Sequence, residues 1–112
     1  MRFGVQPIAQ FQGIQWMLAD MATNIAAARA LGLSATMKRA SDARFSLEAS
    51  MAKLFASEMV GRVTDQALQI HGGYGYSRGM PLERYVRDAR IMRIYEGSSE
   101  IQRNIIARTI LS

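Results

Sequence analysis

The sequence contains no cysteine, which excludes disulfide bonds, thiolate metal sites and a cysteine nucleophile. His71 is the single histidine, so a zinc centre or a serine–histidine triad is disfavoured, and we expect no metal site. No run of about 18 apolar residues is present, so the sequence predicts no membrane span, and its start does not resemble a signal peptide. Because Pro7 and Pro81 are the only prolines, long helices are permitted over most of the chain.

The composition is that of a folded domain. Of the 112 residues, 49% are hydrophobic and 21% are charged, which excludes intrinsic disorder and predicts one domain, residues 1–112, around a single core. Lys and Arg number 14 against 9 Asp and Glu, giving a formal net charge of +5. This excess suits nucleic acid, an anionic membrane surface or a phosphate-bearing ligand. We expect no nucleic-acid partner, because the basic residues are dispersed and no array of aromatic residues and arginine accompanies them.

Hydrophobic periodicity predicts an all-α fold, a four-helix up-down bundle. Apolar residues at a spacing of three and four predict a first helix over residues 8–38, followed by a polar link at 39–43. A second helix is predicted with Ser46 as its N-cap and an apolar stripe that runs to Ile70. The pair at 72–73 ends it, because glycine adopts the left-handed conformation that caps helices.

The remaining third of the chain predicts two shorter helices. Residues 74–80 form a turn-rich loop, and Pro81 suits the first position of a helix that runs to about Ile91. Ser99 and Gln102 have the spacing of a capping box that opens the last helix. No convincing strand alternation is present.

Two segments are unlike ordinary bundle sequence. In Gln69–Tyr76 the paired glycines would let another molecule approach the backbone, although an ordinary helix C-cap explains them as well. In Tyr95–Glu100 a carboxylate lies on a loop ahead of a helix N-terminus. Held against an apolar ligand, Glu96 would lose hydration and become a better proton acceptor. Alternatively, Glu96 and Glu100 only favour the positive end of the helix dipole.

Three further features have structural explanations. Trp16 and the methionines of the long helices are predicted to lie in the core or in a subunit interface. We expect His71 to be a loop residue with one hydrogen bond, and Arg87–Asp88 to be a structural ion pair.

The order and spacing of these segments resemble the C-terminal helical domain of the acyl-CoA dehydrogenase family over essentially all of the chain. The resemblance is carried by the stretches FGVQPI with FQ, LADMA, MAKLFASE, QIHGGYGY, PLERYVRDAR and IYEGSSEIQ. It implies that the chain is a fragment of a longer three-domain enzyme and is inactive alone. The implied activity is oxidation of acyl-CoA to trans-2-enoyl-CoA, with FAD as cofactor and an electron-transferring flavoprotein as electron acceptor. It also implies a homodimer or homotetramer, in the bacterial cytoplasm or the mitochondrial matrix.

The resemblance also implies roles for individual residues. Glu96 matches the catalytic base, and Gly97 matches the glycine whose backbone meets the acyl-CoA substrate. Ser98 replaces a commoner threonine but keeps the hydroxyl. The positions that match FAD contacts are Gln12, Ser98, Ser99 and Glu100, together with Gln69, Ile70, His71, Gly72 and Gly73, which match a loop that reaches the FAD of a neighbouring subunit. The alternative is a non-catalytic helical module for oligomerisation or interaction.

Overall fold

The computed structural model describes residues 2–3, 6–41, 44–77, 79 and 81–112. Three predictions fall partly outside these residues, at Gly4 and Val5 of the first stretch, Asp42 and Ala43 of the link, and Arg78 and Met80 of the turn-rich loop. The elements in chain order are β1 (Arg2–Phe3), β2 (Gln6–Pro7), η1 (Ile8–Gln10), α1 (Gln12–Ala40), α2 (Ser46–His71), α3 (Gly73–Tyr76), α4 (Pro81–Arg90), η2 (Ile91–Arg93) and α5 (Ser99–Leu111).

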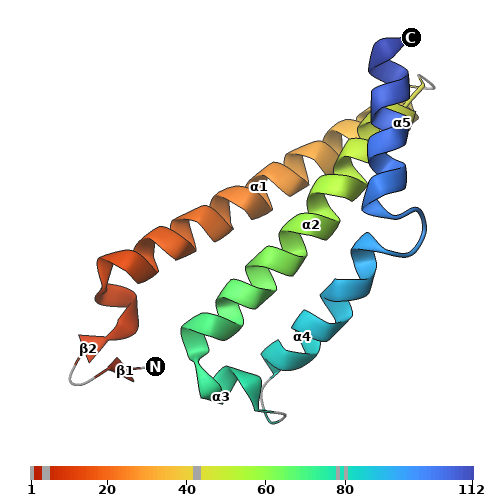
Figure 1. The fold of residues 1–112 in the computed structure, drawn as a ribbon. Helices are drawn as coiled ribbons and strands as arrows, with labels where there is room; N and C mark the ends of the chain where they lie inside the picture. Colours follow the sequence, from red (N-terminus) through yellow and green to blue (C-terminus); the bar gives the residue numbers. More distant parts are fainter. Residues whose placement is uncertain (1, 4–5, 42–43, 78, 80) are drawn as a thin grey trace.

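The central helix is α2, which packs against α1, α4 and α5 (Figure 1). The chain runs along α1, returns along α2, and runs back along α4 and then α5. The last two helices therefore lie one after the other beside α2. This arrangement confirms the predicted all-α class with four main helices.

The N-terminal segment differs from the predicted continuous helix. β1 and β2 pair antiparallel over two residues each, which is too short for any alternation to appear in the sequence. The 3₁₀ turn η1 follows, and α1 begins only after Phe11, whose backbone is extended at φ −78° and ψ 133°. At its far end α1 continues to Ala40, two residues beyond the predicted end.

The start of α2 corrects one prediction. Ser46 is the first residue of α2, so the N-cap position belongs to Phe45, which has no side-chain acceptor. Ser46 therefore cannot act as the N-cap, because that role needs a residue with non-helical backbone.

The end of α2 is at His71, and Gly72 follows with φ +64° and ψ −148°. A positive φ at the first glycine is confirmed, but this ψ lies outside the left-handed helical region, in a region that is essentially restricted to glycine. Gly73 then opens the four-residue helix α3, which occupies part of the predicted turn-rich loop.

The fourth helix follows its prediction closely. α4 begins at Pro81 and ends at Arg90, one residue before the predicted end. Within it, Arg87 makes a structural ion pair, but its partner is Glu83, one helical turn away, with Nε and Oε2 2.9 Å apart. Residues four apart share a helix face whereas adjacent residues do not, which explains why Asp88 is not the partner.

The core is thinner than the composition suggested. Among the described residues, Met59 and Ala89 are the buried hydrophobic side chains, and α1 has no buried residue. The Cα radius of gyration is 17.2 Å, against about 13 Å for a compact domain of this length. The single core that the composition predicts is therefore thin in this chain, because α1 leaves large apolar residues such as Trp16, Leu33 and Met37 exposed.

Candidate functional site

The loop between η2 and α5 places Glu96 in an unusual backbone conformation. Glu96 has φ +55°, and Gly97 follows with φ +91°. Positive φ is disfavoured for a residue with a Cβ, and it persists where the surrounding structure enforces it. The side chain of Glu96 is exposed, so this conformation presents a carboxylate outward from the loop.

Lys53, in the first half of α2, forms hydrogen bonds to this loop. Its ammonium Nζ donates to the carbonyl oxygen of Tyr95 at 3.0 Å and to that of Gly97 at 2.6 Å. A second donor reaches the same place from α5, because Gln102 Nε2 lies 3.3 Å from the Gly97 oxygen. The Tyr95 carbonyl is thus hydrogen-bonded to α2, and the Gly97 carbonyl to both α2 and α5.

Gly97 is required by both backbone and space. A Cβ at this position would lie 2.6 Å from Nε2 of the buried Gln102, so that amide would have to move away from the loop carbonyl. The φ of +91° would add strain for any other residue. The structure therefore gives a reason within the fold itself for a glycine after Glu96.

The helix after the loop is capped by Ser98, and this corrects the predicted capping box. Ser98 Oγ accepts from the amide of Ile101 at 3.4 Å, so the N-cap lies one residue before the predicted Ser99. Ser99 is buried instead, and its hydroxyl donates to Oε1 of Glu58 on α2 at 2.7 Å. Its side chain is therefore engaged within the fold, which leaves its backbone amide for any contact with a cofactor.

Glu58 joins α5 and η2 to α2. Besides accepting from Ser99, its carboxylate pairs through Oε2 with Arg93 at 3.2 Å. The pKa of the Glu58 carboxyl lies below its ordinary value of 4.5, chiefly because the Ser99 hydroxyl donates to it. Arg93 lowers the pKa further, while partial desolvation opposes the shift.

The segment Gln69–Gly73 lies at the other end of α2. His71 is the last helical residue rather than a loop residue, and its predicted single hydrogen bond is present, from Nδ1 to the Ala67 oxygen at 2.9 Å. The Gly72 amide donates to the Gln69 oxygen at 3.0 Å. Apart from Gly72 and its two chain neighbours, no described residue has an atom within 4 Å of the position that a Cβ would take at Gly72, so this face is open.

The predicted site residues form two separate clusters within one chain. Lys53 and Gln69 are 16 positions apart on α2, which corresponds to about 24 Å along the helix. Gln12 opens α1 at the same end of the α1–α2 hairpin as the Gln69–Gly73 segment (Figure 1). The loop that carries Glu96 and the segment Gln69–Gly73 therefore cannot both contact one small ligand from a single chain.

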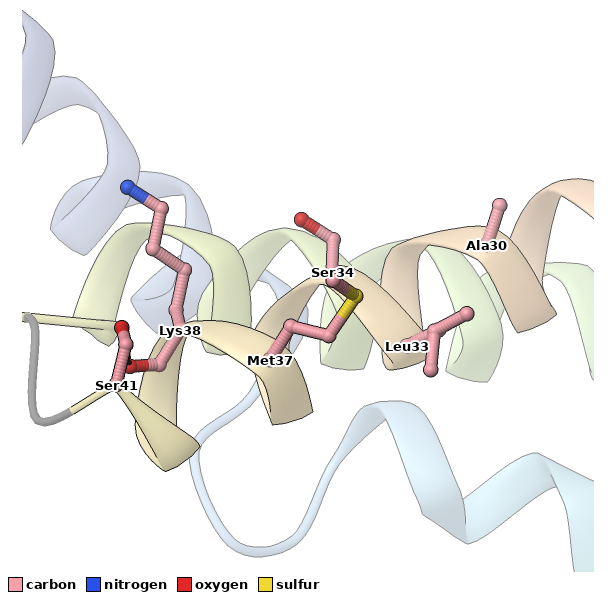
Figure 2. A pocket seen from close by; sticks show the side chains of 6 residues that line it. All are labelled: Ala30, Leu33, Ser34, Met37, Lys38 and Ser41. Carbon is pink, nitrogen blue, oxygen red and sulfur yellow. Dashed lines mark hydrogen bonds between the residues drawn. The ribbon is translucent and has the colours of Figure 1, made fainter.

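An open hollow of about 540 Å³ lies on neither cluster. It follows the far end of α1 and is lined by Ala30, Leu33, Ser34, Met37, Lys38 and Ser41 (Figure 2). Figure 2 shows Leu33 and Met37 along the helix, and Ser41 donating through its hydroxyl to the Lys38 carbonyl at 2.9 Å. The residues that line the hollow include no carboxylate and none of the predicted site residues.

Sequence reasoning missed the residues that support the loop, Lys53, Glu58 and Arg93. Lys53 and Glu58 belong to the stretch MAKLFASE and Arg93 precedes the loop, but their partners lie 42, 44 and 35 residues away in sequence. Within the described residues no group of three potential metal ligands occurs. None of the described helices is both long and apolar enough to cross a membrane.

Comparison with known proteins identifies the class to which this helical fold belongs. The family model of the acyl-CoA dehydrogenase C-terminal domain matches residues 1–111. The chain therefore belongs to the acyl-CoA dehydrogenase family, and it corresponds to the C-terminal domain of that family.

Individual relatives agree with this assignment. The acryloyl-CoA reductase (NADH) of Anaerotignum propionicum is 54% identical over 110 residues, which are 98% of this chain and 28% of the relative. Butyryl-CoA dehydrogenase from Megasphaera elsdenii has a TM-score of 0.96 at 43% identity, covering 100% of this chain and 29% of that chain. A structure described as the electron transferring flavoprotein of Acidaminococcus fermentans matches with a TM-score of 0.95 at 46% identity, over 99% and 29% of the two chains. The chain thus spans just over a quarter of the length of the proteins it resembles.

Proposed function

We propose that this chain is the C-terminal, base-bearing part of a flavin-dependent acyl-CoA dehydrogenase that oxidises acyl-CoA to trans-2-enoyl-CoA. The observation that carries the proposal is the loop of Glu96, an exposed carboxylate in a disfavoured backbone conformation that α2 and α5 hold in place. Strained residues that the fold enforces are found preferentially at active sites. Family membership supports the same assignment.

In this proposal the Glu96 carboxylate accepts the proton from the carbon next to the thioester carbonyl. FAD, when bound, supplies the acceptor for the hydride that leaves the next carbon, and the double bond forms between the two carbons. The backbone at Gly97 meets the acyl-CoA substrate, because no Cβ stands in the way there. Lys53 and Gln102 fix the loop carbonyls in advance, so the base needs little reorganisation to reach the proton.

The residues present suit FAD at two places. At the start of α5, Ser98 caps the amide of Ile101 and its carbonyl accepts from Gln102, which leaves the amides of Ser99 and Glu100 for an external acceptor. At the end of α2, Gly72 offers an open backbone face, flanked by Gln69, Ile70, His71 and Gly73. Gln12 lies at that same end of the hairpin.

The separation of the two clusters supports the proposal of a homodimer or homotetramer. Because the two clusters are separated along α2, we propose that Gln69–Gly73 would help to hold the FAD that is used with Glu96 of a neighbouring subunit. The exposed apolar residues of α1 support association, since Trp16, Leu33 and Met37 are 63%, 61% and 64% exposed. A helix that is apolar on several faces is normally covered on more than one side.

The reverse reaction, reduction of a 2-enoyl-CoA, is the second candidate, favoured by the 54% identity to an acryloyl-CoA reductase (NADH). The same carboxylate would then return a proton to the carbon next to the carbonyl. An electron-transferring flavoprotein as partner is supported by the similarity to the Acidaminococcus fermentans structure. We place the enzyme in the bacterial cytoplasm or the mitochondrial matrix.

The test is an anaerobic titration of the FAD-loaded protein that carries this chain, with saturated acyl-CoA substrates of increasing chain length. We expect the oxidised flavin absorbance to bleach, with trans-2-enoyl-CoA formed in equal amount. A dithionite-reduced sample given 2-enoyl-CoA tests the reverse direction. If the protein binds no flavin, or if no acyl-CoA or enoyl-CoA changes the absorbance, the proposal fails in favour of a non-catalytic helical module.

A further inference from the structure

The backbone at Glu96 needs an external restraint. An L-residue at φ +55° on an exposed loop would relax to negative φ unless its neighbouring peptide units were fixed. The side chain of Glu96 is exposed and makes none of the hydrogen bonds found among the described residues, so it does not supply the restraint itself. The restraint must therefore act on the backbone on either side.

Lys53 acts on both sides at once. The Tyr95 carbonyl belongs to the peptide unit that precedes Glu96, and the Gly97 carbonyl belongs to the unit that follows Gly97. One ammonium group, 3.0 Å from the first oxygen and 2.6 Å from the second, fixes both ends of the two-residue segment with positive φ. Hydrogen bonds from a charged donor are roughly twice as strong as neutral ones.

The ammonium is not engaged elsewhere. Among the described residues Lys53 forms no ion pair, whereas the other lysine of the chain, Lys38, lies 3.8 Å from Glu48. Lys53 lies on α2 between Ser50 and Ser57, which are both buried. Because the Lys53 ammonium is bonded to carbonyls and not to a carboxylate, its positive charge is not neutralised by an ion pair and lies beside the loop that carries Glu96.

We propose that Lys53 is the positioning residue that holds Glu96 in its reactive conformation, an inference that rests on the proposed role of Glu96 as the base. Lys53 touches neither substrate nor cofactor in this account. It acts through the carbonyls of Tyr95 and Gly97, and its loss lets the loop relax and moves the carboxylate away from the proton.

The experiment compares Lys53→Met with Lys53→Arg in the FAD-loaded protein, with Lys38→Met as the matched control on the other lysine. For Lys53→Met we expect the rate of flavin reduction by acyl-CoA to fall about 10- to 100-fold, as for a misplacement of about 1 Å, with flavin content and the acyl-CoA dissociation constant little changed. Lys53→Arg keeps a charged donor and should recover most of the rate. Lys38→Met should behave as wild type.

A crystal structure of each variant supplies a readout that does not depend on activity. We expect Glu96 to leave the positive φ region in Lys53→Met and to keep it in Lys53→Arg. A Glu96 that keeps its φ in Lys53→Met overturns the proposal, whatever the rate. If Lys53→Met does not fold, an Lys53→Arg variant that keeps the loop geometry but loses the rate overturns it as well. If the loop moves but the wild type never reduces its flavin with acyl-CoA, the proposed function fails while the positioning by Lys53 stands.

Discussion

At the scale of single residues, the backbone of Glu96 and Gly97 has a disfavoured conformation that hydrogen bonds from Lys53 and Gln102 stabilise. Glu96 occupies positive φ, and Gly97 occupies a φ that suits glycine alone. The sequence placed Glu96 on a loop with a glycine after it, but nothing in the sequence indicates that Glu96 itself has positive φ. That property depends on Lys53, which is more than 40 residues away.

Glu96→Gly is expected to stabilise the chain. Removal of the Cβ relieves a backbone cost of about 1–2 kcal/mol, and the greater flexibility of glycine in the unfolded state offsets roughly half of it. We expect a net increase of up to about 1 kcal/mol in the free energy of unfolding. Urea unfolding of the 112-residue chain measures it, with Glu100→Gly, inside α5, as a control that should destabilise. A less stable Glu96→Gly variant would contradict the assignment of strain at Glu96.

At the scale of elements, α2 organises the molecule. It carries Lys53 and Glu58, which hold the loop and the start of α5, and it ends at the Gln69–Gly73 segment. Helices of this length were predictable, because the apolar spacing and the turn signals Gly72 and Pro81 mark them well. The N-cap residues of the helices were less predictable from the sequence.

The cap of α5, predicted at Ser99 but found at Ser98, shows why the N-caps were harder to predict. Ser98 and Ser99 are both suitable caps, and local sequence cannot choose between them. The choice depends on Glu58, 41 residues from Ser99, which accepts the Ser99 hydroxyl and so leaves the N-cap to Ser98. The break at Phe11 was missed for a similar reason, since Ile8 fits the helical spacing although it lies in η1.

The docking of α5 on α2 should depend on pH through Glu58. Its folded-state pKa is below the ordinary 4.5, so its ionised form contributes stability above that pH, and this is lost as the pH falls through the lower folded-state pKa. At pH 7 we expect Glu58→Gln to cost about 1 kcal/mol. Urea unfolding at pH 7 and pH 3 should show that the difference in the free energy of unfolding between wild type and variant is smaller at pH 3. A difference in the free energy of unfolding that does not change with pH would contradict this role of Glu58.

At the scale of the whole molecule, the chain is an elongated hairpin with further helices on one side. Its extents are 57 × 25 × 24 Å. The composition predicted a single core, but the percentage of apolar residues does not reveal which of them a long helix leaves exposed. Trp16, predicted to lie in the core or in a subunit interface, is 63% exposed in this chain, which leaves the interface as its expected place.

The separation of the two site clusters belongs to this scale as well. The motifs of the sequence suggested contacts at both Gln69–Gly73 and Glu96–Glu100, and only the fold shows that the two lie apart along α2. In the proposed function, a complete site therefore combines more than one copy of this chain with the regions that its longer relatives possess.

The most direct test of the account is the rate of flavin reduction in Glu96→Gln, measured by stopped-flow absorbance under anaerobic conditions with saturating acyl-CoA. The amide keeps the size of the side chain but cannot accept the proton, so we expect a rate lower by about 10²- to 10⁴-fold, with flavin and acyl-CoA binding retained. Asp65→Asn, which neutralises an exposed carboxylate on α2, should reduce its flavin as fast as wild type. Reduction of Glu96→Gln at the wild-type rate would contradict the assignment of Glu96 as the base.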